Sequence, residues 1–250
     1  MAVWDTEENG RTELTRRTLE SLFDTVDFRK HRLIVSDNNS CADTQKIYDN
    51  QSATYSVIYN NENLGTSRAI NRAWQYRKPG EHAIKIDNDV VIHQSGWVDE
   101  MEEAIIRDSQ IGIIGLKRKD IIQNTQHPDI NFRSELVQLP HDNGQRWVIV
   151  ERTPDIIGTC TMFNSALLDK VGFSKQVRNY GFEDVLFCHR SHLAGFYNCF
   201  LPHIEIDHID PGNTPYQDWK HKVSGEDTAA MIEIFKGYKD GTRNIYEPFY

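Results

Sequence analysis

The chain has 250 residues, of which 38% are hydrophobic and 10% aromatic, which suits one globular domain with a sizeable core. Its 28 basic and 37 acidic residues give a net charge of −9, which argues against a protein whose affinity rests on neutralising a nucleic-acid backbone. No apolar run approaches the roughly 20 residues that cross a bilayer, and no basic stretch followed by an apolar one marks a secretion signal at the amino terminus.

The first half of the chain alternates helical and β-rich segments. Apolar residues recur at helical spacing in four segments and form short β-rich runs in four others. This alternation with short connections predicts an α/β fold built on a single doubly wound mixed sheet. The expected helices are 12–23, 40–48, 66–76 and 95–106, and the expected strands are 32–36, 55–59, 82–86 and 111–117.

The second half is less regular but shows no linker, so we expect one domain over residues 1–250. Residues 118–145 are polar and hold two prolines, which favours a variable excursion. The expected strands are 146–151, 156–163 and 196–210, and the expected helices are 165–172, 181–195 and a last one around 229–235. The cysteines, Cys41, Cys160, Cys188 and Cys199, lack metal-like spacing, so we expect buried free thiols and a cytoplasmic location.

Two aspartates follow the strand 82–86 directly. Asp87 and Asp89 are one residue apart, so their carboxylates can converge where the strand ends. Close carboxylates repel each other unless a cation lies between them, and oxygen ligands suit a divalent ion such as Mn²⁺ or Mg²⁺. The motif is short and common, and loop aspartates that cap the next helix explain it equally well when it is taken alone.

Two further polar loops precede this motif. Asp37 also follows a strand and should lie at the same sheet edge, although a turn and helix cap through Ser40 and Asp43 suffices to explain it. In the next loop, Gly65 stands at a helix start with Arg68 one turn in. This arrangement suits an anion at the helix amino terminus, and capping beside a surface arginine explains it nearly as well.

Two motifs in the second half could complete a site. Glu183 and Asp184 open a predicted helix, where the helix dipole favours acids, but one of them could equally be a general base while the other orients a hydroxyl. In the strand 196–210, alternation places His208 on the apolar face. A lone histidine there is more often a packed core residue, but beside a carboxylate pair it is a credible third metal ligand.

The order of these motifs resembles the A-type (GT-A fold) glycosyltransferases of the large inverting family 2, which use nucleotide-diphosphate sugars. The resemblance covers about residues 2–210 and rests on VSDNNSCADT, NENLGTSRAIN, DND, YGFEDVLFCHR and a downstream histidine, in that order. It implies a Rossmann-like nucleotide-sugar-binding half at 1–117 and an acceptor and catalytic half at 118–210. For residues 211–250 we expect a carboxyl-terminal lid and helix, because the tail from Gly212 to Asp227 holds glycine, proline and Trp219.

The resemblance also implies which residues contact the donor. Asp37 would read the nucleobase, and Arg68 would lie near the nucleotide. Further contacts to the nucleotide sugar are implied for Thr6, Asn39, Gly65, Asp87 and Asn88. The chain departs from the family at its first strand, because only three residues follow Met1 before Asp5, although Thr6 matches the threonine of the family's PTYN-like turn.

For the reaction itself, the resemblance implies that Asp87 and Asp89 hold Mn²⁺ or Mg²⁺ on the diphosphate, with His208 as a third ligand. Two other roles stay open for Asp87: contact with the ribose of the donor, or contact with the metal through water. Asp184 would be the general base, and Glu183 would contact the acceptor.

We therefore expect a metal-dependent, inverting transfer of a sugar from a nucleotide-diphosphate donor, a UDP-sugar by family precedent, to an acceptor hydroxyl. A retaining transferase of the same fold and a degenerate sugar-nucleotide-binding module stay open as alternatives. The segment DTEENGR is too acidic for the basic, glycine-rich loop of a sugar-nucleotidyltransferase. A saccharide, a lipid-linked sugar, a protein or a modified nucleic-acid base could each be the acceptor, and the net charge disfavours the last.

Overall fold

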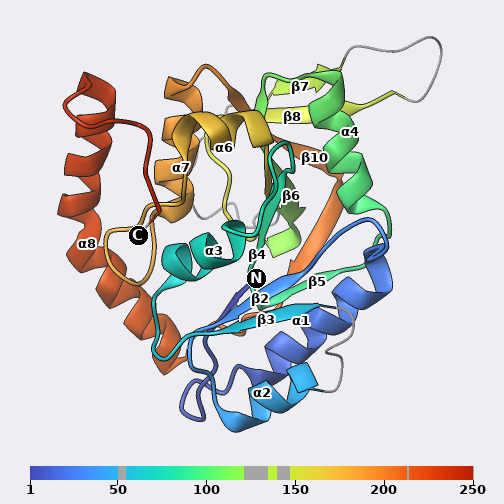
Figure 1. Cartoon of the computed structure of the whole chain (residues 1–250), viewed down its shortest axis with the longest axis vertical. Coiled ribbons are helices and arrows are strands. Elements are labelled where there is room, and N and C mark those ends of the chain that lie inside the picture. The colour runs from blue at the N-terminus through green and yellow to red at the C-terminus, as the bar shows by residue number, and fades with distance from the viewer. Residues whose placement is uncertain (50–54, 121–134, 140–146, 213, 250) are drawn as a thin grey trace.

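The computed structural model describes residues 1–49, 55–120, 135–139, 147–212 and 214–249 (Figure 1). The first half alternates strands and helices as the sequence predicts, with one short strand, β5, that it did not predict. Its elements are β1 (Ala2–Val3), α1 (Thr12–Thr25), β2 (Ile34–Asp37), α2 (Ala42–Asp49), β3 (Ser56–Tyr59), α3 (Thr66–Trp74), β4 (Ala83–Ile86), β5 (Val90–Ile92), α4 (Trp97–Arg107) and β6 (Ile111–Arg118).

The second half adds the remaining strands and the helices α6, α7 and α8. Its elements are β7 (Glu135–Gln138), β8 (Ile149–Thr153), β9 (Cys160–Phe163), α6 (Ser165–Val171), α7 (Glu183–Leu193), β10 (Tyr197–His208) and α8 (Pro215–Asp240). The expected excursion at 118–145 contains β7, and most of it lies outside the described residues. The last helix is far longer than 229–235, because it begins at Pro215, with Thr214 as its side-chain cap, and so includes most of the expected lid.

The strands form a parallel sheet, β1-β2-β3, and a mixed sheet in the order β4-β9-β6-β10-β8-β7, with β5 paired to the end of β10. The mixed α/β architecture predicted from the sequence is confirmed, and the hydrogen-bonded ladder is interrupted between β1 and β4. The amino terminus lies where the two sheets meet (Figure 1). A cavity of about 430 Å³ at this junction is lined by Met1, Ile34 and Ile84 among others and contains none of the predicted site residues.

Two apolar clusters hold the layers together. The larger one packs α1 and α4 against both sheets and includes Leu22, Trp97 and Met101, all with almost no exposure. In the smaller one, Phe163 of β9 lies between Trp74 of α3 and Phe187 of α7, with ring centroids 5.0 and 4.6 Å apart. Burial of each such side chain stabilises the fold by roughly 1.5–3 kcal/mol. The smaller cluster therefore fixes the start of α7 against the end of the mixed sheet.

Three of the four cysteines are buried, Cys41 is partly exposed, and all four are free thiols, as predicted. Within the described ranges, no helix combines the length and the apolar character needed to cross a membrane. The predicted cap by Ser40 and Asp43 is wrong. Ser40 Oγ instead accepts a hydrogen bond from the backbone N–H of Asp5, and Asp43 pairs with Lys46.

A buried carboxylate after β1 ties together the elements that carry the site. Asp5 Oδ2 accepts hydrogen bonds from Thr15 Oγ1 of α1 at 2.6 Å and from Thr44 Oγ1 of α2 at 3.2 Å. Asp5 Oδ1 accepts one from Asn88 Nδ2 at 2.8 Å. Burial raises the pKa of Asp5 from 3.8 to about 6, although these hydroxyls and Arg11 act in the opposite direction.

We expect Asp5→Asn to change how the stability depends on pH. The folded state keeps a proton on Asp5 that the unfolded state releases above its pKa of 3.8, so this group lowers the stability as the pH rises through the window from 3.8 to about 6. The variant stays neutral, so its free energy of unfolding relative to wild type should rise by about 3 kcal/mol between pH 3 and pH 7.5.

Urea denaturation at several pH values measures this difference, with the exposed Asp24→Asn on α1 as the control. An identical pH dependence in wild type and Asp5→Asn would contradict the raised pKa.

Candidate active site

The turn Asp87–Asn88–Asp89 connects β4 to β5, and the pairing of β5 decides what it faces. β5 runs antiparallel to the end of β10, with Val90 opposite His208. The carbonyl of Asp89 accepts a hydrogen bond of 2.8 Å from the N–H of Ile209. Asp89 is thereby brought beside a segment about 120 residues further along the chain.

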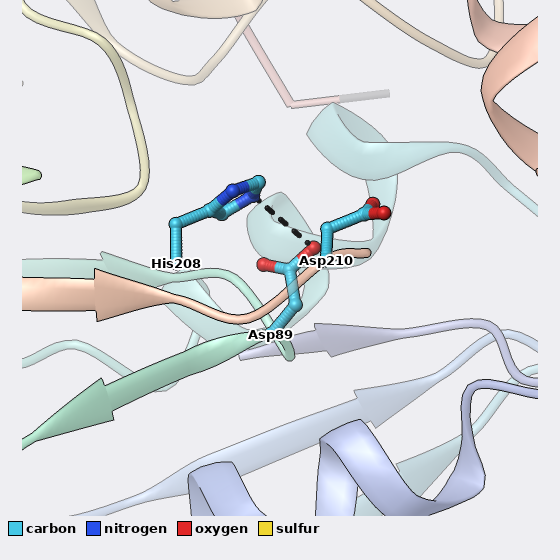
Figure 2. A group of neighbouring side chains, drawn as sticks. All are labelled: Asp89, His208 and Asp210. Atoms are coloured by element: carbon cyan, nitrogen blue, oxygen red, sulfur yellow. Dashed lines mark ion pairs between the residues drawn. The ribbon is translucent and has the colours of Figure 1, made fainter. Parts of the chain in front are cut away.

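Three side chains gather at this junction and form what we call the cation group: Asp89, His208 and Asp210. One potential ligand atom of each lies within 4.8 Å of the others. Figure 2 shows the three side chains on the same side of the two strands, and the dashed line joins His208 Nε2 to Asp89 Oδ2 at 3.5 Å. The sequence prediction missed Asp210, although its place two residues after His208 was a usable signal.

Arg11, just before α1, pairs with both carboxylates of the cation group. Its guanidinium contacts Asp89 Oδ2 at 2.5 Å and Asp210 Oδ2 at 2.9 Å, and all three side chains are at least 95% buried. Lys220 of α8 adds a contact to Asp210 at 3.1 Å. Burial alone would raise the pKa of Asp89, but His208, Arg11 and Lys220 together hold it below its ordinary value.

The cation group has the chemistry of a divalent metal site. Two carboxylates and one imidazole are ligands that Mn²⁺ accepts, and Mg²⁺ takes the oxygens. Asp89 Oδ1 is buried and accepts no hydrogen bond from any described residue, so it retains an unused acceptor within the group. The residues therefore fit a divalent ion, which would have to share Asp89 and Asp210 with Arg11.

Asp87 lies outside the cation group. Its Oδ1 is 3.0 Å from the ammonium of Lys85, a β4 residue whose side chain is 6% exposed. Lys85 Nζ also lies 3.2 Å from Glu183 Oε1 at the start of α7. Burial raises the pKa of Asp87, and the attraction of Lys85 opposes that rise. The prediction missed Lys85, although a lysine within the apolar run HAIKI was a visible sign of a buried partner.

Glu183 and Asp184 begin α7, as predicted, and both are engaged from outside the helix. Asp184 Oδ2 accepts a hydrogen bond of 3.1 Å from the N–H of Gly158 in the loop before β9. Glu183 is held by Lys85 on one oxygen and by Gln176 Nε2 at 3.3 Å on the other. Lys85 therefore contacts both Asp87 and Glu183 of the acidic pair. These two predicted residues are 96 positions apart in sequence and belong to one site.

The predicted nucleobase contact, Asp37, is fully buried at the end of β2. Its oxygens accept hydrogen bonds from the Ser40 N–H at 2.8 Å and from Tyr48 Oη at 2.9 Å. Asn39 is exposed with a left-handed φ of 63°. Thr6 forms a closed turn with Asn9, in which each accepts a hydrogen bond from the backbone N–H of the other at 2.9 and 3.1 Å.

The remaining donor-side predictions fall on both sides of this edge. Asn88 donates to Asp5 Oδ1 and to Thr15 Oγ1, so its amide braces the turn. Arg68 is exposed on α3. Gly65, with φ 78°, lies so close to Asn179 that an added Cβ would be 2.6 Å from its backbone. The glycine thus allows the start of α3 to approach the loop that precedes α7.

The family described as "Glycosyl transferase family 2" matches residues 9–172 of the sequence. This range includes the loops after β2 and β4 but ends before α7 and β10, so Glu183, Asp184 and His208 lie beyond it. A search of curated protein sequences finds no significant match.

Three solved structures illustrate the fold. The mannosyltransferase PcManGT from Pyrobaculum calidifontis, in complex with GDP-Man and Mn²⁺, is 15% identical with a TM-score of 0.59 over 87% of this chain and 59% of its own. GalNAc-T7 with UDP, GalNAc and Mn²⁺ is 17% identical, with a TM-score of 0.59, over 84% and 43%. S. aureus TarS 1–349 is 17% identical, with a TM-score of 0.59, over 84% and 60%. The chain therefore spans about half the length of these proteins, and the likeness shows the fold.

We expect Gly65→Ala to destabilise the protein by about 2–4 kcal/mol, the sum of backbone strain and overpacking against Asn179. Gly195→Ala is the matched control, because Gly195 also has a positive φ of 87° but has open space at its Cβ position, so strain alone should cost about 1–2 kcal/mol. Urea denaturation of both variants measures the difference, and equal losses would contradict the close approach at Gly65.

Proposed function

The chain belongs to glycosyl transferase family 2, and on this basis we propose that it is a metal-dependent, inverting transferase that moves a sugar from a UDP-sugar to an acceptor hydroxyl. One observation carries the proposal. The cation group and the acidic pair Glu183–Asp184 occur at the same edge of the mixed sheet, with the Asp87–Lys85 contact between them. Donor activation and acceptor activation require these two kinds of group side by side.

The cation group would hold the metal. Asp89, His208 and Asp210 supply two carboxylates and an imidazole, and Asp89 Oδ1 is the buried acceptor still unused. A bound divalent ion would neutralise the charge that develops on the leaving diphosphate. The Mn²⁺ complexes of PcManGT and GalNAc-T7 support this assignment by analogy. Arg11 and Lys220 place further positive charge beside the same edge, where a diphosphate would lie.

The acidic pair would act on the acceptor. Asp184 takes the proton of the acceptor hydroxyl, while the oxygen of that hydroxyl forms a bond to the anomeric carbon and the bond from that carbon to the diphosphate breaks. Attack from the face opposite to the leaving group inverts the anomeric configuration. The Gly158 N–H on Asp184 Oδ2 fixes the orientation of the carboxylate, and Glu183, held by Lys85, positions the hydroxyl.

The start of α8 borders the donor side of the site, which supports a lid role for residues 211–250. Tyr216 and Trp219 pack against Trp4 with ring centroids 6.1 and 5.5 Å away, and Arg11 lies over the Tyr216 ring at 4.7 Å. These contacts link the lid segment to Arg11, which pairs with both carboxylates of the cation group. Asp37 and Arg68 stay the proposed contacts of the nucleobase and the nucleotide.

A screen of nucleotide sugars, with and without Mn²⁺, tests the function. We expect slow hydrolysis or transfer of a UDP-sugar in the presence of Mn²⁺, and NMR of the sugar product should show inversion at the anomeric carbon. A product with retained configuration would support the retaining alternative. Binding of nucleotide sugars without turnover would support the degenerate binding module.

We expect Asp89→Ala to abolish Mn²⁺-dependent binding of UDP, because the variant removes the carboxylate of the cation group that keeps a buried oxygen unused. Isothermal titration of UDP at several Mn²⁺ concentrations measures this. Asp207→Ala is the control, since Asp207 lies next to His208 on β10 but pairs with His93 and Lys119. Unchanged Mn²⁺ dependence in Asp89→Ala would rule out the metal assignment.

We expect Asp184→Asn to leave UDP binding near normal and to lower turnover by roughly 10²–10⁴-fold, the usual contribution of a general base. The exposed Asp169→Asn on α6 serves as the control for a lost surface carboxylate. A near-normal rate in Asp184→Asn would assign the base to another residue.

A further inference from the structure

We propose that Lys85 is a positioning residue for the transfer reaction, because its buried ammonium joins the donor-side Asp87 to the acceptor-side Glu183. The two aspartates of the motif Asp87–Asn88–Asp89 then have different roles: Asp87 pairs with Lys85, and Asp89 would bind the metal. This inference rests on the function proposed above and adds a residue that neither the motif nor the family match identifies.

Lys85 is buried at the centre of β4, between the two halves of the site. Its Nζ lies 3.0 Å from Asp87 Oδ1 and 3.2 Å from Glu183 Oε1, and the side chains of Lys85 and Glu183 are only 6% and 12% exposed. Thr161 of β9 is its register partner across the sheet. A lysine placed in this way bridges two carboxylates from different parts of the chain, one in the turn after β4 and one at the start of α7.

The loop before β9 is shaped around this ammonium. A Cβ added to Gly158 would lie 2.8 Å from Lys85 Nζ and 3.1 Å from Asp184 Cβ, so a larger residue there would displace the ammonium from its present position. The N–H of the same glycine donates to Asp184 Oδ2 at 3.1 Å, and the carbonyl of Thr159 accepts from the Asp87 N–H at 2.9 Å. The loop therefore contacts Asp87 and Asp184 and lies directly against the ammonium of Lys85.

An ammonium buried in this way needs charged partners, because desolvation of a single charge costs several kcal/mol. Burial alone would lower the pKa of Lys85, but Asp87, Glu183 and Asp184 hold it above its ordinary value. The positive charge is therefore permanent, and it fixes the rotamers of the carboxylates that contact it. Loss of the charge would leave Asp87 and Glu183 free to repel each other and to move from their places.

The contact between Asp87 and Lys85 also explains why the cation group contains Asp89 but not Asp87. Asp89 reaches His208 and Asp210 through the pairing of β5 with β10, whereas Asp87 remains at the end of β4 beside Lys85. Lys85 therefore acts on the acceptor side, through Glu183, and should contribute little to metal binding. If Lys85 only neutralised buried acids, its loss would not affect the acceptor side more than metal binding.

The test compares Lys85→Met and Lys85→Arg with wild type in the full chain, with the UDP-sugar that the wild-type enzyme turns over. Lys85→Met removes the charge with little change of volume. Lys85→Arg keeps the charge, and with it the paired carboxylates needed for folding, but its larger head cannot keep the same contacts beside Gly158. We expect both variants to bind UDP and Mn²⁺ within about threefold of wild type while kcat falls by about 10²-fold for Lys85→Met and at least about tenfold for Lys85→Arg.

A double-mutant cycle identifies the residue through which Lys85 acts. If it acts through Glu183, Lys85→Met should lower kcat much less in a Glu183→Gln background than in wild type. Lys117→Met is the matched control, since Lys117 is a strand lysine paired with Glu151 outside the site.

Each other outcome overturns the inference. Near-normal kcat in a folded Lys85→Arg, additive losses in the cycle, or loss of Mn²⁺-dependent UDP binding in parallel with kcat would show a structural or metal-linked role instead. If Lys85→Met does not fold, Lys85→Arg alone decides between these results. A wild-type chain that turns over no nucleotide sugar would overturn the proposed function and this inference together, whereas an active wild type with a normal Lys85→Arg overturns only the inference.

Discussion

The matching of buried carboxylates by buried cations is the constraint on which the site depends. Strand ends and turns place the buried Asp89 and Asp210, and the partly exposed Asp87, at one edge, where repulsion between their charges would oppose folding. Arg11 bridges Asp89 and Asp210, and Lys85 holds Asp87. Each cation comes from a different part of the chain, so charge pairing also holds the first helix, β4 and the end of β10 in one arrangement.

These pairings divide the edge into two regions with different chemistry. On one side, the cation group has a buried, unused carboxylate oxygen, and Arg11 and Lys220 add positive charge that suits a diphosphate. On the other side, the acidic pair at the start of α7 is held by Gly158 and Lys85 and lies where a hydroxyl could lose its proton. The proposed reaction requires both regions, because departure of the diphosphate and deprotonation of the acceptor occur in one step. Lys85 joins the acidic pair, through Glu183, to Asp87, which is two residues before Asp89 of the cation group.

Much of the fold could be predicted, because the apolar periodicity of α1, α3, α4 and α7 reports which faces are buried. The length of α8 could not, since its hydrophobic positions are weakly periodic and its first turns are stabilised by aromatic contacts with Trp4 and Tyr180. The short β5 was missed because three apolar residues are too few for a periodic signal, and pairing with β10 makes them a strand. The cap predicted at Ser40 failed because the backbone N–H of Asp5, in the segment after β1, donates to that hydroxyl instead.

The sequence by itself determined the class of fold, the edge at which the polar motifs gather, and the candidates Asp89, His208, Glu183 and Asp184, since strand ends and helix starts are local properties. Only the tertiary structure decided the partners of these residues. Asp210 joins Asp89 because β5 pairs with β10, and Asp87 turns to Lys85 because α7 brings Glu183 to the same ammonium. Pairing between charges far apart in sequence depends on strand order and register, and no local pattern of residues encodes either of these.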